Sequence, residues 1–322
     1  MRRSAIRLRT VILWTLAVLA VTAAPVLAAY PERPITYVIA FNPGGESDIT
    51  ARIQEPVLEK VMGVDVVVTY KIGGGGSVAW AETVRTRPDG YTIVGHNLPH
   101  IILQPLQRGD AGYKTEQLQT VYWFESTPNV LAVRTDSQFK TLQDLIDYAR
   151  EHPEVVTVGG SGSNTANHLG TLALNKLAKV KTTYIPFTGT GAAVPALLGG
   201  HVTALMTYTP VAVQYKDRFR ILAVASDQRV SWLPDVPTFR ELGYDIVEGA
   251  YRGVAVPPGT PKEVIKALED AFDKVMRDPK VVEQMDRLGF KIEYMKSEEG
   301  TRFVQERTEF YKSLLGELGL LQ

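Results

Sequence analysis

The chain has 322 residues, 35 basic and 35 acidic side chains, and no cysteine. This length predicts about two domains, and the absence of a basic surplus gives no reason to expect a nucleic-acid partner. Without cysteine, the chain can form neither disulfides nor thiolate metal sites.

The first 28 residues follow the order of a secretory signal peptide. A basic start, MRRSAIRLR, precedes an apolar run that ends in small residues at Ala28 and Ala29. This order predicts export, with cleavage after Ala28 or, as the second choice, after Ala29. An uncleaved membrane anchor is the alternative, because the apolar run approaches the length of a bilayer span. No later stretch of the sequence is long and apolar enough to cross a membrane.

Strand-like and helix-like segments alternate along the rest of the chain. Residues 35–41 predict a buried strand, and residues 47–63 predict a helix with apolar residues four apart on one face. Pro56 is expected to kink this helix or to end its regular part. The next predicted elements are a strand at 64–70, a helix at 77–86, and a turn followed by a strand at 87–96.

The second part of the chain repeats this alternation. Strands are predicted at 130–135, 155–160, 182–187, 201–208, 219–226 and 251–256. Helices are predicted at 141–153 with Thr141 as cap, in 161–179 after a Gly/Ser turn, in 188–200, after Pro261, and twice more before the C-terminus. The pattern predicts an α/β protein with parallel strands and helices on both faces of the sheet.

Four glycine-rich turns share one position, between the end of a strand and the start of a helix. They are FNPGGESD (41–48), IGGGGS (72–77), GGSGSN (159–164) and FTGTG (187–191). Such turns line the crevice where ligands bind in open parallel sheets. Each helix N-terminus offers free N–H donors and partial positive charge, which glycines leave accessible to an anion. Further donors are the hydroxyls of Ser47, Ser77, Ser161, Ser163, Thr188 and Thr190. The turns therefore predict anion capture by backbone rather than by arginine, with tight packing of the turns as the alternative.

The sequence also resembles a family, the tripartite tricarboxylate transporter substrate-binding proteins, or Bug and TctC-like receptors. The family's opening is matched by Tyr30-Pro31, Pro34-Ile35, Pro43-Gly44-Gly45, Asp48 and Ala51-Arg52. Further matching blocks, in the family's order, are GGGGSVAWAETVRTRPDGYTI, GGSGSNTANHLG, YIPFTGTGAAVPALLGGHVTAL, LAVASDQRVSWLPDVPTFRELGY and GVAVPPGTP.

The resemblance implies a type II-like periplasmic binding protein with an α/β fold. Each of two lobes would be a mainly parallel sheet flanked by helices, with the ligand cleft between the lobes. It implies a signal peptide at 1–28, a first lobe at 29–129 plus 249–322, and a second lobe at 130–248. The chain would cross between lobes near 128–130 and 248–251, and these crossings would act as hinges.

In function, the resemblance implies a periplasmic receptor that performs no catalysis and uses no cofactor or metal. Its ligand would be a small organic carboxylate, namely a di- or tricarboxylate, an acidic amino acid or an aromatic acid. Its partners would be the membrane subunits of a tripartite transporter or, alternatively, a sensor kinase, and the receptor itself would be a monomer.

Ligand-binding positions carried over from the family fall in the four turns. In the first lobe they are Asn42, Pro43, Gly44, Gly45, Ser47, Asp48, Gly75, Gly76 and Ser77. In the second lobe they are Ser161, Gly162, Ser163, Asn167, His168, Thr188 and Gly189.

Some positions depart from the family's pattern. Glu46 stands where small or apolar residues are common, and in the cleft it would repel a second carboxylate or favour an amine or hydroxyl. We also include His96 and Asn97, which follow the third strand, as residues that could point into the cleft. For His168 a packing or capping role is as well supported as ligand contact. Tyr208 could equally belong to the core or to an aromatic wall against the ligand.

An exported enzyme that acts on a small carboxylate is the alternative function, but the enzyme motifs are missing or incomplete. No turn fits the G-x-S-x-G elbow of serine hydrolases, the G-x-G-x-x-G dinucleotide loop or the phosphate-binding P-loop. His96 and His100 have the spacing of a metal pair on a helix, but Pro99 between them argues against a helix there.

Overall fold

A computed structural model describes residues 30–321 of the chain. The predicted signal peptide at 1–28 lies outside these residues. Within the described part, no helix has both the length and the apolar character that a membrane span requires.

The first sheet contains the strand order β2-β1-β3-β9-β4. Its strands are β1 (Ile35–Ile39), β2 (Val66–Tyr70), β3 (Thr92–Leu98), β4 (Gln119–Arg134), β9 (Gly249–Val256) and β10 (Lys291–Lys296), which pairs with β4. The pairs β1–β2 and β1–β3 are parallel, as expected from the alternating pattern. Strands β4, β9 and β10 add antiparallel pairs to this sheet.

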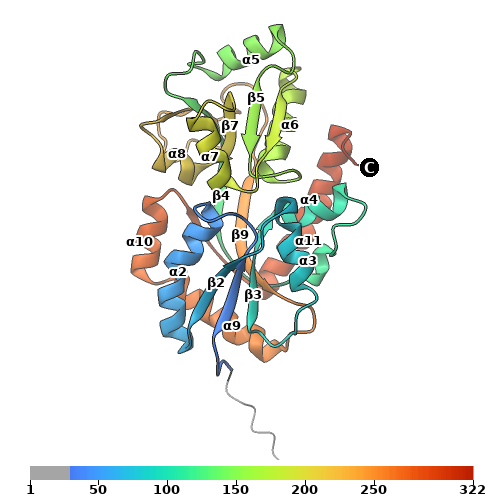
Figure 1. Cartoon of the computed structure of the whole chain (residues 1–322), viewed down its shortest axis with the longest axis vertical. Coiled ribbons are helices and arrows are strands. Elements are labelled where there is room, and N and C mark those ends of the chain that lie inside the picture. The colour runs from blue at the N-terminus through green and yellow to red at the C-terminus, as the bar shows by residue number, and fades with distance from the viewer. Residues whose placement is uncertain (1–29, 322) are drawn as a thin grey trace, which may run out of the picture. The chain divides into compact units, whose positions relative to one another are not determined.

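The second sheet continues from β4 in the order β4-β7-β5-β6. Its other strands are β5 (Thr157–Gly160), β6 (Thr183–Pro186), β7 (Ala204–Tyr208) and β8 (Phe219–Val224), which also pairs with β4. Strand β4 changes partner between two consecutive residues, because Pro128 pairs with Gly249 of β9 while Asn129 pairs with Tyr208 of β7. Figure 1 shows β4 and β9 running between the two groups of strands.

Helices pack around both sheets. They are α2 (Glu46–Met62), α3 (Ser77–Thr83), α4 (His100–Gln107), α5 (Leu142–Glu151), α6 (Ala166–Ala178), α7 (Thr190–Leu198), α8 (Thr209–Gln214), α9 (Lys262–Met276), α10 (Pro279–Arg287) and α11 (Ser297–Leu318), with short 3-10 turns at Gly74–Gly76 and Thr115–Gln117. Thr141 caps α5 as predicted, since its hydroxyl accepts the Asp144 N–H.

The expectation that Pro56 ends the regular part of its helix is wrong. Helix α2 continues through Pro56 to Met62. Proline removes one backbone hydrogen bond, and the helix beyond it is held by burial of Leu58, which is 0% exposed. Packing therefore outweighs the local preference at this position.

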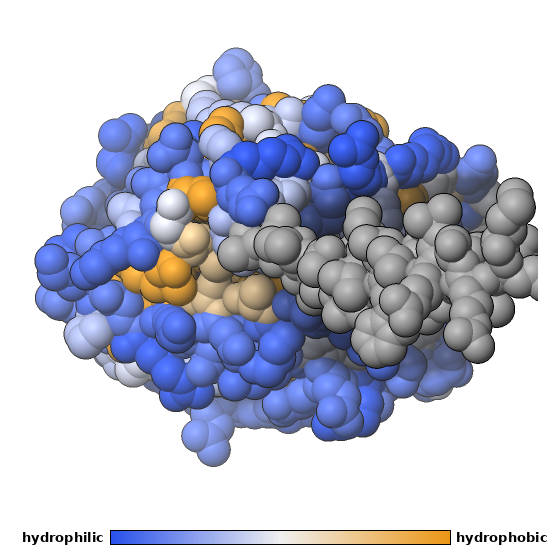
Figure 2. All heavy atoms as spheres, turned by 90° about the horizontal axis from the view of Figure 1, so that it is seen from below, coloured by the Kyte–Doolittle hydropathy of each residue, from blue (hydrophilic) through white to orange (hydrophobic). Residues whose placement is uncertain are grey.

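Each sheet has its own hydrophobic core. Residues packed beside the first sheet include Trp80, Leu98 and Trp123, and those beside the second include Leu131, Ile146 and Met206. Seen from below, the surface is mostly hydrophilic around a group of hydrophobic residues (Figure 2). Separate cores leave the polar turns between the sheets free to form a binding site.

Candidate ligand-binding site

The four glycine-rich turns meet in two pairs. The turn 41–48, after β1, contacts the turn 187–191, after β6, so closely that a methyl group on Gly191 would lie 2.3 Å from the Pro43 carbonyl oxygen. The turn 72–77 likewise contacts the turn 159–164, where a methyl group on Gly75 would lie 2.5 Å from the Ser163 carbonyl oxygen. Glycine is therefore needed at these contacts because no side chain fits between the two backbones.

Gln104 of α4 forms hydrogen bonds to both turns of the second pair. Its side-chain amide donates to the carbonyl oxygens of Ser163 at 2.7 Å, Asn164 at 3.1 Å and Gly75 at 3.4 Å. The amide is buried, so these bonds are shielded from water. Both sheets thus contribute backbone to one closed contact.

A small cavity lies where the first pair of turns meets. It is lined by Phe41, Gly45, Glu46, Ser47, Asn97, His100, Ser161, Thr190, Tyr208 and Arg252. The space open to the centres of water-sized molecules is about 10 Å³, which is roughly what one water molecule requires. A larger ligand would have to enter while the turns are apart, and the side chains of the cavity wall would have to move to make room for it when the turns meet.

Two helices begin at this cavity without a side-chain cap. Gly45 precedes α2 and Gly189 precedes α7, and neither offers a side-chain acceptor to the first N–H groups of its helix. The early N–H groups of a helix have no partner within the helix and carry partial positive charge. Their position beside the cavity suits an anion.

Asp48 holds the first turn in shape. Its carboxylate accepts the Gly44 N–H at 2.7 Å and the Tyr70 hydroxyl at 2.6 Å, and it lies 3.5 Å from Arg52 Nε. Gly44 has φ +78°, which glycine adopts without strain. Asp48 is therefore committed to the turn and does not line the cavity.

A buried charged cluster lies beside the cavity. Arg252 of β9 is 3% exposed, and its guanidinium lies 3.8 Å from Glu46 and 3.5 Å from Glu125. It donates to the Thr127 hydroxyl at 2.6 Å, while the Thr50 hydroxyl donates to Glu125 at 2.7 Å. Burial raises the pKa of Glu125 to about 8, although Arg252 opposes this shift. The cluster places one cation between two carboxyl groups.

Aromatic and polar side chains complete the cavity wall. The Tyr208 ring lies 4.8 Å from the guanidinium carbon of Arg252, within the range of a cation–π contact. The Tyr208 hydroxyl is 3.4 Å from His100 Nε2. Asn97 donates to the Ser47 hydroxyl at 3.2 Å. Tyr208 therefore belongs to the wall of the cavity as well as to a buried cluster.

Asn167 holds the turn 159–164 in place through hydrogen bonds. Its side-chain oxygen accepts the Ser161 N–H at 3.0 Å and the Ser161 hydroxyl at 2.6 Å, and its amide donates to Asn129 at 3.0 Å. His168 accepts the Asn164 N–H at 3.2 Å, which is the capping role considered from the sequence. These residues position Ser161, which reaches the cavity.

Seven of the sequence-predicted residues line the cavity: Gly45, Glu46, Ser47, Asn97, Ser161, Thr190 and Tyr208. The others form or brace the turns without lining it: Asn42, Pro43, Gly44, Asp48, Gly75, Gly76, Ser77, Gly162, Ser163, Asn167, His168, Thr188 and Gly189. His96 lies away from it, stacked on the Trp123 ring at 3.9 Å. Phe41, His100 and Arg252 line the cavity but were not predicted as ligand-binding residues.

The sequence around Arg252 indicates that this arginine is buried. It is the charged residue in the strand segment GAYRGVAV, whose other members are mostly apolar or small. Arginine is almost never fully buried unless it is paired, so an arginine in a buried strand indicates a buried partner. The expected capture of an anion by backbone alone is incomplete, because a guanidinium stands beside the same cavity.

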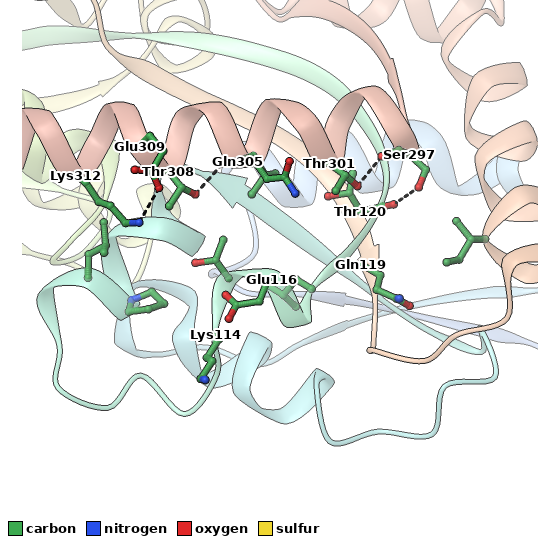
Figure 3. A pocket seen from close by; sticks show the side chains of 16 residues that line it. Lys114, Glu116, Gln119, Thr120, Ser297, Thr301, Gln305, Thr308, Glu309 and Lys312 are labelled. Carbon is green, nitrogen blue, oxygen red and sulfur yellow. Dashed lines mark hydrogen bonds and ion pairs between the residues drawn. The ribbon is translucent and has the colours of Figure 1, made fainter.

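A larger cavity, of about 670 Å³, lies elsewhere, between α11 and residues 105–120. Figure 3 shows side chains of α11, such as Gln305 and Thr308, facing side chains such as Glu116 and Gln119. Lys312 in its wall pairs with Glu309 at 2.7 Å. None of its lining residues belongs to the four turns, so size alone does not identify the ligand site.

Buried titratable groups predict how stability depends on pH. Burial raises the pKa of Glu125 to about 8 and that of Glu248 to about 7, from 4.5. Burial lowers the pKa of His96 and His100 to about 3 and that of His168 to about 4, from 6.5. The folded state thus holds extra protons on two glutamates and lacks protons on three histidines.

We expect the free energy of unfolding to be greatest near pH 6.5. As pH rises from 4.5 through 7 and 8, the two glutamates lose their stabilising contribution to the free energy of unfolding, because the unfolded chain releases the glutamate protons at a lower pH than the folded chain. As pH falls below 6.5, the unfolded chain binds three histidine protons that the folded state does not bind, which lowers the free energy of unfolding. The two protons held by the folded glutamates offset only part of this decrease. Urea unfolding across this range measures it. A free energy that rises from pH 6.5 to pH 8 would contradict the assignment.

Solved structures of known proteins have a similar fold. The periplasmic binding protein BugD has a TM-score of 0.86 and 28% identity, over 91% of this chain and 99% of that chain. MatC from Rhodopseudomonas palustris, solved with bound malate, has a TM-score of 0.85 and 26% identity, over 89% of this chain and 100% of that chain. The fold is that of a periplasmic binding protein.

The family is shown by the sequence. A model described as the tripartite tricarboxylate transporter family receptor, TctC, matches residues 50–320. A Cupriavidus necator protein, named UPF0065 protein in gbd 5'region, is 32% identical over 293 residues, which is 90% of this chain and 89% of that protein. The chain belongs to the TctC receptor family. It is a solute-binding receptor and not an enzyme, and membership implies membrane transport subunits as partners.

Proposed function

We propose that this receptor captures a small organic carboxylate for a tripartite tricarboxylate-type transporter. The candidates are a di- or tricarboxylate, an acidic amino acid or an aromatic acid. The observation that carries the proposal is the meeting of two uncapped helix N-termini, those of α2 and α7, at one buried cavity beside Arg252. The similar R. palustris protein was solved with malate, a carboxylate.

Capture would require the two sheets to move relative to one another. In our proposal the first lobe comprises residues 29–129 and 249–322, and the second lobe comprises 130–248. Support comes from β4, whose partner changes from β9 to β7 at residues 128–129. The ligand would complete contacts with both lobes and so shift an open–closed equilibrium toward the closed form. The membrane subunits would recognise the closed form.

The location follows from the same proposal. Residues 1–28 would direct export and be removed, which leaves the receptor in the periplasm. N-terminal sequencing of the exported protein tests this, and we expect a start at residue 29. A mature protein that retains residues 1–28 would favour the membrane anchor instead.

Calorimetry tests the ligand class. We expect the purified protein, stripped of carried ligand by unfolding and refolding, to bind at least one carboxylate among malate, citrate, glutamate and benzoate. Neutral sugars of similar size serve as controls, because they carry no charge for the helix N-termini. Binding of a sugar, together with no binding of any carboxylate, would refute the proposal.

A further inference from the structure

Glu46 is a buried carboxylate with an unused acceptor. It is the first residue of α2, is 4% exposed and lines the cavity. Its Oε1 atom has no hydrogen-bond partner in the part of the chain that the structure describes. A buried acceptor without a hydrogen-bond partner destabilises the fold, because it has lost its bonds to water and gained none in return. A ligand donor at this atom would remove that penalty.

Arg252 does not satisfy Glu46. The 3.8 Å between Arg252 Nη2 and Glu46 Oε2 is too long for a hydrogen bond. Arg252 donates instead to Thr127, and it also lies 3.5 Å from Glu125. One guanidinium is therefore shared between two carboxyl groups, and the cavity has no surplus of positive side-chain charge.

The remaining donors lie on the backbone. The N–H groups at the starts of α2 and α7 suit one carboxylate of a ligand. A second carboxylate in this small cavity would meet Glu46, which lines it. A protonated amine would instead find an unpaired carboxylate oxygen, and such charge-assisted bonds are the strong ones.

We propose that Glu46 binds the ammonium group of the ligand, and that the ligand is an amino acid rather than a plain polycarboxylate. The carboxylate of the amino acid lies toward the helix N-termini and its amine toward Glu46. This inference rests on the proposed function, since it assumes that the cavity between the turns is the ligand site.

Matched ligand pairs test the role of Glu46. The pairs are aspartate and succinate, glutamate and glutarate, and phenylalanine and 3-phenylpropionate, which differ only in the amine. We expect calorimetry to show that the amine-bearing member of at least one pair binds about tenfold or more tightly. Glu46→Gln should abolish this preference, because the amide has no charge to attract the ammonium group. Glu55→Gln, on the same helix but outside the cavity, should retain it.

The outcomes separate the two proposals. Equal affinity within every pair, or a preference that survives Glu46→Gln in a variant whose thermal unfolding is unchanged, overturns the role of Glu46 and leaves carboxylate binding intact. If Glu46→Gln unfolds, the ligand pairs on the unaltered protein still decide. An absence of binding in all pairs, with binding of a neutral solute, overturns both proposals.

Discussion

Gly191→Ala is expected to weaken ligand binding by about a hundredfold while leaving the protein folded. The added methyl group would lie 2.3 Å from the Pro43 carbonyl oxygen, so the turns 41–48 and 187–191 could not meet. In the proposed open–closed equilibrium only the closed form would contain this contact, so the substitution would lower the closed population and with it the apparent affinity. Alanine is also favoured over glycine within a helix, and Gly191 lies in the first turn of α7. Stability should therefore be unchanged or slightly higher.

The measurements are calorimetric affinity and thermal unfolding of the same preparation. Gly109→Ala is the matched control, because a methyl group there meets no atom within 4 Å. If Gly191→Ala lowers the affinity but leaves thermal unfolding unchanged, the effect comes from blocked closure and not from misfolding. An affinity equal to that of the Gly109→Ala protein would show that the two turns do not meet in the bound state.

Turn chemistry made the four turns predictable. Each is a local pattern, glycine after an apolar run and before a helix, and glycine is needed where backbones approach closely. Elements without a local signal were missed. Strand β10 (Lys291–Lys296) has three charged residues among its six and is only partly buried, and the first part of β4 contains Glu125 within its apolar run. Their place in the sheet is decided by the strands beside them.

The charged cluster could not be predicted for a related reason. Glu125 and Arg252 are directly opposite one another in the antiparallel pair of β4 and β9. Their meeting depends on the register of two strands far apart in sequence, which no local pattern encodes. Glu46, in contrast, follows a glycine pair that the sequence already placed at a helix start, so its approach to the cavity could be foreseen.

Arg252→Met is expected to lower the free energy of unfolding by about 3–5 kcal/mol near pH 9, where the Glu125 carboxyl group, whose pKa is raised to about 8, is ionised. Methionine fills a similar volume but leaves Glu46 and Glu125 buried without their shared cation. Removing one partner of a buried ion pair is far more destabilising than replacing the whole pair. Urea unfolding measures the change, and Arg33→Met, at an arginine whose side chain is 56% exposed, is the control with an expected loss of at most about 1 kcal/mol.

The double variant Arg252→Met, Glu125→Gln gives the sharper test. If the loss arises from an uncompensated buried charge, removal of the Glu125 carboxyl should restore at least about 1 kcal/mol of it at pH 9. The loss in the single variant should also grow as pH rises from 7 to 9, because burial raises the pKa of Glu125 to about 8 and a carboxyl group that ionises in this range no longer has its opposing cation. A loss that the second substitution does not reduce, and that is the same at pH 7 and pH 9, would assign the effect of Arg252 to packing against Tyr208 rather than to charge.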